Sequence, residues 1–307
     1  MIRWTAAGAV STPTTVQIRV QRSYPGRIRA GAPVPTRSMS RKELLENLTY
    51  FTEGLDGPRT KPCKGLVLSG VGVATRPDIP EAIERARALG IAWVVLHVGG
   101  EDLDTLKPAR FAGLVDTLVT PVQPENGTLV KVCNTIERAR AEGLKVAANT
   151  VLTANALPAL ARASRPLAKA APDGMTFTYP FPINGNEATS APNPGRVMSA
   201  LRPALAVLDR AGVKAQIKGL PACHLGQDAH RLGRTSNRYY VDADHQTEHA
   251  LVFFPDVVRF HKDDSCRFCT KNESCDGFFS TYLRRPGFPP LSPFESTKSD
   301  SVTDQLS

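Results

Sequence analysis

Short apolar segments alternate with amphipathic segments through most of this chain, and this alternation constrains the fold more than any other feature. Seven segments have the length and the apolar or β-branched residues of strands. The expected strands are residues 15–20, 65–70, 92–98, 114–120, 144–152, 174–181 and 213–219. The expected helices are residues 41–51, 78–90, roughly 104–113, 127–143, 155–171 and 194–212. Nearly continuous apolar strands that alternate with helices predict an α/β fold with a parallel sheet covered by helices.

Seven strands with six crossovers can curl into an open or partial barrel. A flat doubly wound sheet is the alternative, and periodicity does not separate the two. The alternation ends at Gly219, so we expect residues 15–219 to form this domain after an N-terminal arm, residues 1–14. Residues 220–285 are expected to form a small appended domain. Residues 286–307 are rich in Pro and Ser and then polar, which predicts disorder.

The composition excludes several classes of protein. Hydrophobic residues make up 41% of the 307 residues, but no run of eighteen apolar residues occurs, so no membrane span is expected. The N-terminal sequence MIRWTAAGAVSTPTT lacks the apolar core of a signal peptide, which predicts a cytoplasmic protein. The net charge is +9, yet Arg and Lys stand beside Glu and Asp on the expected helices. We therefore do not expect a nucleic-acid partner.

Four of the six cysteines fall in the last third of the chain, at Cys223, Cys266, Cys269 and Cys275. In a chain of this length without a signal peptide, such clustering indicates a metal site rather than a disulfide framework. Four thiolates suit a 4Fe–4S cluster and equally suit tetrahedral zinc, and the spacing does not decide between them. The other two cysteines, Cys63 and Cys133, are expected to be small core residues.

Histidines also occur in this region, and each is interpreted as a surface or structural residue, with metal ligation or support of a ligand as the alternative. The four considered as candidates are His224, His245, His249 and His261.

Three stretches together resemble radical SAM proteins that carry a C-terminal auxiliary-cluster domain of the SPASM or twitch type. They are GLVLSGVGVATRPDIPEAIERARALGIAWVVLHVGG, then VAANTVLTANALPAL with TFTYPFPINGN, and finally PAC with CRFCTKNESCDGFFSTYL. The resemblance covers roughly residues 15–285. It implies a partial (β/α)6 barrel, similar to a TIM barrel, over residues 15–219. It also implies one auxiliary 4Fe–4S cluster bound by the four cysteines of residues 220–285, with zinc as the alternative.

The chain departs from this family at two places. The family holds its S-adenosylmethionine-cleaving cluster with a CxxxCxxC loop after the first strand. Here that loop reads RSYPGRIRAG, the three positions become Tyr24, Ile28 and Gly31, and residues 1–62 contain no cysteine. The family's Gly-Gly-Glu-Pro turn becomes Gly70-Val71-Gly72-Val73, with Gly72 in place of the Glu. The resemblance therefore implies a vestigial cofactor site at Gly70 and Gly72, and no ordinary radical SAM cleavage by this chain alone.

Three functions follow as hypotheses. The first is a pseudoenzyme that serves as an auxiliary scaffold or electron-transfer protein in peptide or natural-product modification. Its partner would be an active radical SAM enzyme or a peptide substrate. The second is an enzyme that uses S-adenosylmethionine or another ligand at the carboxyl ends of the strands. The third is a zinc-stapled binding module with a basic face. This hypothesis is the weakest of the three, because acidic residues interrupt the basic ones.

The catalytic residues of the second hypothesis are unknown, because the sequence shows no complete set of acid, base and nucleophile. The residues leave open whether any S-adenosylmethionine binding survives. Each candidate ligand contact at the strand ends can also be interpreted as a turn former or a capping polar group, and we favour that interpretation. The candidates are Tyr24, Arg27, Arg29, Gly70, Gly72, His97, Asn149, Tyr179 and Asn184.

Overall fold

A computed structural model describes most of the chain. The described residues are 14–21, 37–53, 62–125, 127–182, 191–233, 238–243, 260–283 and 285–294, together with the backbone of two short strands, β2 (Gly26–Arg27) and β3 (Pro33–Val34).

Nine parallel strands form one sheet, in the order β10-β9-β8-β7-β6-β5-β4-β1-β11. Their bounds are β1 (Thr15–Arg19), β4 (Gly65–Ser69), β5 (Trp93–His97), β6 (Thr117–Pro121), β7 (Val146–Val151), β8 (Gly174–Thr178), β9 (Ala215–Lys218), β10 (Leu232–Gly233) and β11 (Tyr239–Asp242). All seven expected strands are present, and the α/β fold class is confirmed. Within the described residues the two edge strands, β10 and β11, do not pair with each other, so the curved sheet is open.

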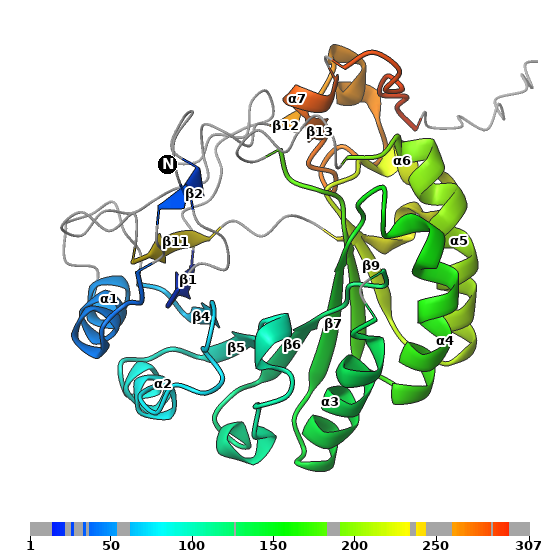
Figure 1. Cartoon of the computed structure of the whole chain (residues 1–307). Helices are drawn as coiled ribbons and strands as arrows, with labels where there is room; N and C mark the ends of the chain where they lie inside the picture. Colours follow the sequence, from blue (N-terminus) through cyan, green and yellow to red (C-terminus); the bar gives the residue numbers. More distant parts are fainter. Residues whose placement is uncertain are drawn as a thin grey trace, which may run out of the picture.

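Helices cover one side of the curved sheet (Figure 1). They are α1 (Arg41–Glu53), α2 (Ile79–Ala88), α3 (Leu129–Ala141), α4 (Leu160–Ala170), which follows the 3-10 helix η3 (Leu157–Ala159), and α5 (Pro194–Arg210). Helix α1 begins with the predicted capping box: Ser40 Oγ accepts from the Glu43 amide at 3.2 Å, and Glu43 Oε2 accepts from the Ser40 amide at 2.8 Å.

The helix expected over roughly 104–113 is wrong. Within that range the chain forms only the 3-10 helix η2 (Pro108–Phe111), and another 3-10 helix, η1 (Gly100–Asp102), precedes it. Proline disfavours helical backbone in the residue before it, and Lys107 is extended, with φ −109° and ψ 93°. The segment therefore bends at Pro108 instead of continuing as an α-helix.

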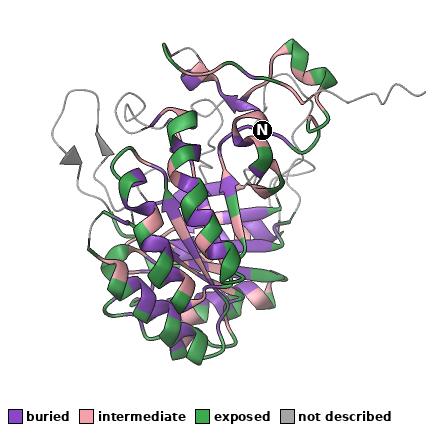
Figure 2. Cartoon of the chain, turned by 90° about the vertical axis from the view of Figure 1, so that its right-hand side faces the viewer, coloured by how far each residue is buried: buried purple, intermediate pink, exposed green. Residues whose placement is uncertain are grey.

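The main core lies between the sheet and these helices. Alternate strand residues such as Ile18, Leu68 and Leu96 are fully buried and belong to one apolar cluster with the helices. The residues between them, such as Arg19 and His97, are only half-buried and face the other side of the sheet. Figure 2 shows the buried strands inside and the exposed outer surfaces of the helices.

The segment after Gly219 contributes both to the main sheet and to a smaller unit. Strands β10 and β11 complete the sheet, so the chain does not leave it at Gly219 as expected. The smaller unit, called the C-terminal unit below, contains the antiparallel pair β12 (Phe260–His261) and β13 (Phe278–Phe279). Four short helices also follow Gly219 in the chain. These are α6 (Ala222–Leu225), η5 (Gly226–Arg231), η6 (Asp264–Phe268) and α7 (Ser280–Leu283).

The expected disorder of residues 286–307 does not hold for the described part, which ends at residue 294. Phe288 stacks on Tyr282 with ring centroids 5.7 Å apart, and Leu291 is buried. Apolar side chains at these two positions fasten a segment whose composition is otherwise that of a flexible tail. Among the described helices, none combines the length and apolar composition needed to cross a lipid bilayer.

Candidate functional site

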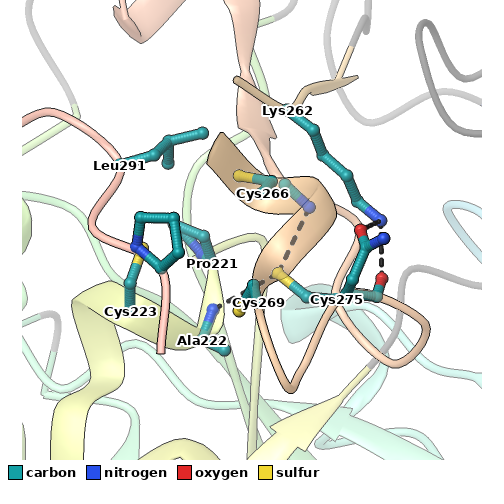
Figure 3. Close-up of a pocket in the computed structure, with 11 residues that line it drawn as sticks. Pro221, Ala222, Cys223, Lys262, Cys266, Cys269, Cys275 and Leu291 are labelled. Carbon is teal, nitrogen blue, oxygen red and sulfur yellow. Dashed lines mark hydrogen bonds between the residues drawn. The ribbon is translucent and has the colours of Figure 1, made fainter. Parts of the chain in front are cut away.

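The four clustered cysteines line one cavity in the C-terminal unit (Figure 3). Cys223 lies in α6, which follows β9 in the chain. Cys266 lies in η6, and Cys269 is the residue after η6. Cys275 precedes β13. The empty space among the lining residues is about 310 Å³, counting its open mouth. The structure thus brings together four residues that lie up to 52 positions apart in the sequence, because 275 − 223 = 52.

All six cysteines of the chain are free thiols, so the four at the cavity are not used in disulfide bonds. Among the described residues, no group of three or more His, Cys, Asp or Glu side chains is placed closely enough for one metal ion. A tetrahedral zinc site needs every sulfur about 2.3 Å from the ion. The thiols surround a common space without forming so tight a shell.

Backbone amides point at two of the cysteine sulfurs. Cys275 Sγ accepts hydrogen bonds from the amide of Gly277 at 3.3 Å and from that of Ala222 at 3.4 Å. Cys269 Sγ accepts from the amide of Lys271 at 3.4 Å. Hydrogen bonds to sulfur are a feature of iron–sulfur sites.

Tight turns hold these sulfurs in place. The Cys269 amide donates to the Cys266 carbonyl at 3.1 Å, and the Cys275 amide donates to the Lys271 carbonyl at 2.9 Å. Gly277 has φ +86°, and a Cβ there would lie 2.2 Å from the His261 carbonyl oxygen. Only glycine fits this close approach, which places the Gly277 amide at the Cys275 sulfur.

Burial raises the pKa of the Cys223 thiol, and the neighbouring thiols of Cys275 and Cys266 raise it further. Burial also raises the pKa of Cys266, with smaller increases from Asp263 and the thiols of Cys269 and Cys275. Several thiolates in one half-buried cavity repel one another. A bound cationic centre would therefore favour the thiolates of Cys223 and Cys266.

An aromatic cluster fastens this unit to the end of β8. Tyr179 is completely buried and contacts Phe278 and Tyr282, with ring centroids 5.6 Å and 5.4 Å apart. Tyr282 Oη donates to the Pro180 carbonyl at 2.9 Å. Tyr179 was a candidate ligand contact, and this expectation is wrong: its ring packs in the core, and its hydroxyl donates to the Pro192 carbonyl at 2.5 Å.

The remaining cysteines and the described histidines have structural surroundings. Cys63 is buried, which raises its pKa to about 12, and Cys133 packs on the core side of α3. His224 packs against Phe278 and contacts the Pro290 carbonyl at 3.2 Å. His261 Nε2 lies 2.8 Å from Asp263 Oδ1. The other two histidines of this region, His245 and His249, lie outside the described residues.

The two candidate glycines form the turn after β4. Gly70 has φ +114° and Gly72 has φ +71°, and a Cβ on Gly70 would lie 2.5 Å from the Gln21 carbonyl oxygen. The two glycines therefore form a tight turn, and Gly72 provides no carboxylate.

Sequence reasoning missed a carboxylate beside this turn. Asp102 of η1 is 3% exposed and accepts a hydrogen bond from the Gly99 amide at 3.3 Å. Burial raises the pKa of Asp102, and hydrogen bonds from the amides of Gly99, Gly72 and Ala74 oppose that rise. Asp102 thus ties the loop after β5 to the glycine turn. The only sequence signal is an acidic residue three positions after a strand-end glycine.

The other candidate ligand contacts fall into two groups. Asn149 Oδ1 accepts from Thr178 Oγ1 at 2.9 Å, across the face of the sheet away from the helices. His97 ends β5 on the same face, and burial together with Arg238, Lys218 and Arg19 lowers its pKa to about 4. Arg27 lies in β2, whose side chains are not described. Positions outside the described residues are Tyr24, Ile28, Arg29, Gly31 and Asn184.

The fold is similar to that of several solved structures. Streptococcus suis SuiB bound to S-adenosylmethionine matches 94% of this chain and 77% of its own, with a TM-score of 0.57 and 11% identity. The same protein bound to its precursor peptide SuiA matches 94% and 76%, with a TM-score of 0.59 and 11% identity. Native anSMEcpe with bound AdoMet matches 92% and 93%, with a TM-score of 0.56 and 11% identity.

No protein-family model matches the chain, and no curated protein matches it in sequence. At 11% identity the likeness concerns the fold alone. It shows that this chain shares the α/β fold of these solved structures.

Proposed function

We propose that this protein is an auxiliary iron–sulfur protein with a radical SAM-like fold, which binds one 4Fe–4S cluster through Cys223, Cys266, Cys269 and Cys275. The observation that carries the proposal is the cavity lined by all four thiols. The four cysteines come from separate parts of the chain, and none of them forms a disulfide bond. Core packing alone gives no reason for this convergence.

Four thiols around one space suit a 4Fe–4S cluster and also suit one zinc ion. We favour the cluster because the proteins that the sequence resembles carry one. The amides that donate to Cys275 and Cys269 would stabilise the thiolates and tune a cluster's potential. When bound, such a cluster supplies one-electron transfer.

The proposal assigns this chain no cleavage of S-adenosylmethionine by itself. Residues 1–62 contain no cysteine, so the loop after β1 cannot supply three thiolates. Gly72 stands where the family has a carboxylate. In this proposal the curved sheet and its helices serve as a scaffold. The C-terminal cluster serves as a structural or electron-transfer element beside an active radical SAM enzyme. A peptide is the favoured substrate of such a pair, because a structural neighbour was solved with its precursor peptide.

The experiment compares visible and electron paramagnetic resonance spectra of the anaerobically purified chain with and without S-adenosylmethionine. The proposal predicts one cluster, whose spectra the added cofactor leaves unchanged. A second cluster whose signal shifts with S-adenosylmethionine would overturn the auxiliary role. Turnover of the cofactor by the purified chain alone would overturn it as well.

A further inference from the structure

A lysine side chain lines the cysteine cavity beside the four thiols (Figure 3). Lys262 is the residue after β12, and apart from the cysteines it alone carries an ionisable side chain among the described lining residues. The other lining residues are Pro221, Ala222, Asn272, Gly277, Leu291 and Pro293. Such a lining screens a charge less than water does, so the Lys262 ammonium acts on whatever the cavity holds.

Contacts at both ends of the side chain hold Lys262 in place. Its Nζ donates to the backbone carbonyl of Asn272 at 2.6 Å and to Asn272 Oδ1 at 2.9 Å. Asn272 belongs to the loop between Cys269 and Cys275, and its amide donates to the Cys269 carbonyl at 3.0 Å. The lysine stem lies against Gly277, because a Cβ added there would be 2.9 Å from the Lys262 Cγ. The ammonium therefore has a defined position at the cavity.

The charge of Lys262 is not neutralised by the groups that hold it. Both of its hydrogen-bond acceptors are oxygens of the uncharged Asn272. The carboxylate of Asp263, the next residue, lies instead 2.8 Å from His261 Nε2. Glu273 is on the same loop as Asn272 but is exposed, so water screens its charge. Lys262 thus places a net positive charge beside the four thiols.

We propose that Lys262 raises the reduction potential of the iron–sulfur cluster bound in this cavity. The inference rests on the proposed function, because a zinc ion at the same thiols has no such potential. Reduction adds one electron to the cluster and makes the site more negative by one charge, without making or breaking a bond. A fixed cation stabilises the reduced form more than the oxidised form, and local charge is among the factors that set cluster potentials.

The test measures the midpoint potential of the cluster in the full chain after anaerobic purification. Dithionite is the reductant, electron paramagnetic resonance follows the reduced cluster, and iron and sulfide are measured on every sample. Lys262→Gln removes the charge and keeps an amide donor, so it should lower the midpoint potential. Lys262→Arg keeps the charge, so its potential should stay close to that of the original chain.

Two further variants complete the set. Lys262→Met is a second neutral variant, and it retains an unbranched stem to lie against Gly277 in case the shorter glutamine loosens the loop. Arg267→Gln is the matched control, because Arg267 has the same charge and follows Cys266 directly but does not line the cavity. The Arg267 side chain is 62% exposed and lies 3.1 Å from Asp264 Oδ1. Water screens this charge, so Arg267→Gln should lower the potential less than Lys262→Gln.

Three results would overturn the inference. The first is an unchanged potential in both neutral variants at Lys262. The second is an equal shift in Lys262→Gln and Arg267→Gln, which indicates a general effect of surface charge. The third is loss of iron from both neutral variants, which would make Lys262 a structural support of the loop instead. In each case the original chain still contains its cluster, so the proposed function stands, whereas an original chain without iron and sulfide overturns both.

Discussion

The amide of Ala222 donates a hydrogen bond to the sulfur of Cys275 at 3.4 Å, although the two residues lie 53 positions apart. Cys223 follows Ala222 directly, so this bond fixes two of the four cysteines beside each other. It also links α6, which follows β9, to the loop before β13. The cysteine cavity is therefore a product of tertiary structure, and changes that loosen this link should be seen in metal content.

Removal of one cavity thiol tests the ligand set. Cys275→Ala should abolish most of the bound iron and sulfide, because three thiolates leave one iron without its protein ligand. Cys133→Ala is the matched control, since Cys133 is a free thiol packed on the core side of α3. Iron and sulfide per chain are measured after anaerobic purification. Equal iron in the Cys275→Ala variant and the original chain would remove Cys275 from the set.

Substitutions at two glycines distinguish the effect of backbone strain on stability from the effect of a steric clash near the cavity. Gly277 and Gly287 both have positive φ, at +86° and +80°. An added Cβ at Gly277 meets the His261 carbonyl oxygen at 2.2 Å, whereas nothing lies within 4 Å at Gly287. Gly287→Ala should cost about 1 kcal/mol for its backbone conformation. Gly277→Ala should cost more and also lower the iron content.

Urea unfolding and iron analysis of the two glycine variants check this expectation. Similar losses of stability and unchanged iron in both would show that the close approach at Gly277 does not position the Cys275 sulfur.

We expect the aromatic cluster to stabilise the packing of the C-terminal unit against the end of β8. Phe278 is fully buried, so Phe278→Ala should cost about 3–5 kcal/mol. Phe268 lies between two of the cysteines but is 75% exposed, so Phe268→Ala should change stability by about 0.5 kcal/mol or less. Urea midpoints give both values. Comparable costs at the two positions would contradict the packing described here.

The sequence predicts the sheet far better than it predicts the site. Continuous apolar runs such as Gly65–Ser69 identify strands because both of their faces are covered. The two-residue strand β10 carries too little pattern to be recognised, and so does β11, which pairs with β1 from the far end of the chain. Pro108 interrupts an otherwise helical composition.

The sequence likewise predicts only some of the residues of the candidate site. Cysteine spacing predicts Cys266, Cys269 and Cys275 as a group, because local turns hold them. The place of Cys223 in the set depends on long-range contacts such as the Ala222–Cys275 hydrogen bond. Tyr179 is at a strand end, as expected of a ligand contact, yet the C-terminal unit covers it. Asp102 acquires its position through contacts with the turn after β4, which sequence periodicity does not reveal.

An ion pair at the start of α2 should make stability depend on pH. Arg76 Nε donates to Asp78 Oδ1 at 2.9 Å, and this guanidinium holds the pKa of Asp78 below its ordinary value of 3.8. Because the folded pKa is lowered, the stabilisation is present above pH 3.8 and is lost as pH falls through the lowered pKa. Asp78→Asn should therefore cost about 1–3 kcal/mol at neutral pH and progressively less in acid.

The exposed pair of Asp104 and Lys131 is the control for this ion pair. Their side chains are 63% and 55% exposed, so Asp104→Asn should change stability little at any pH. Urea unfolding of both variants across the acid range gives the comparison. A cost of Asp78→Asn that stays constant down to acid pH would show that the ion pair does not stabilise the fold through its charge.

The central claim is that the four cavity thiols bind one iron–sulfur cluster, and the most direct measurement is the iron, sulfide and zinc content of the anaerobically purified chain. The account predicts about four irons and four sulfides per chain, together with a brown visible spectrum. About one zinc per chain without sulfide would contradict it and indicate a zinc-stapled binding protein instead.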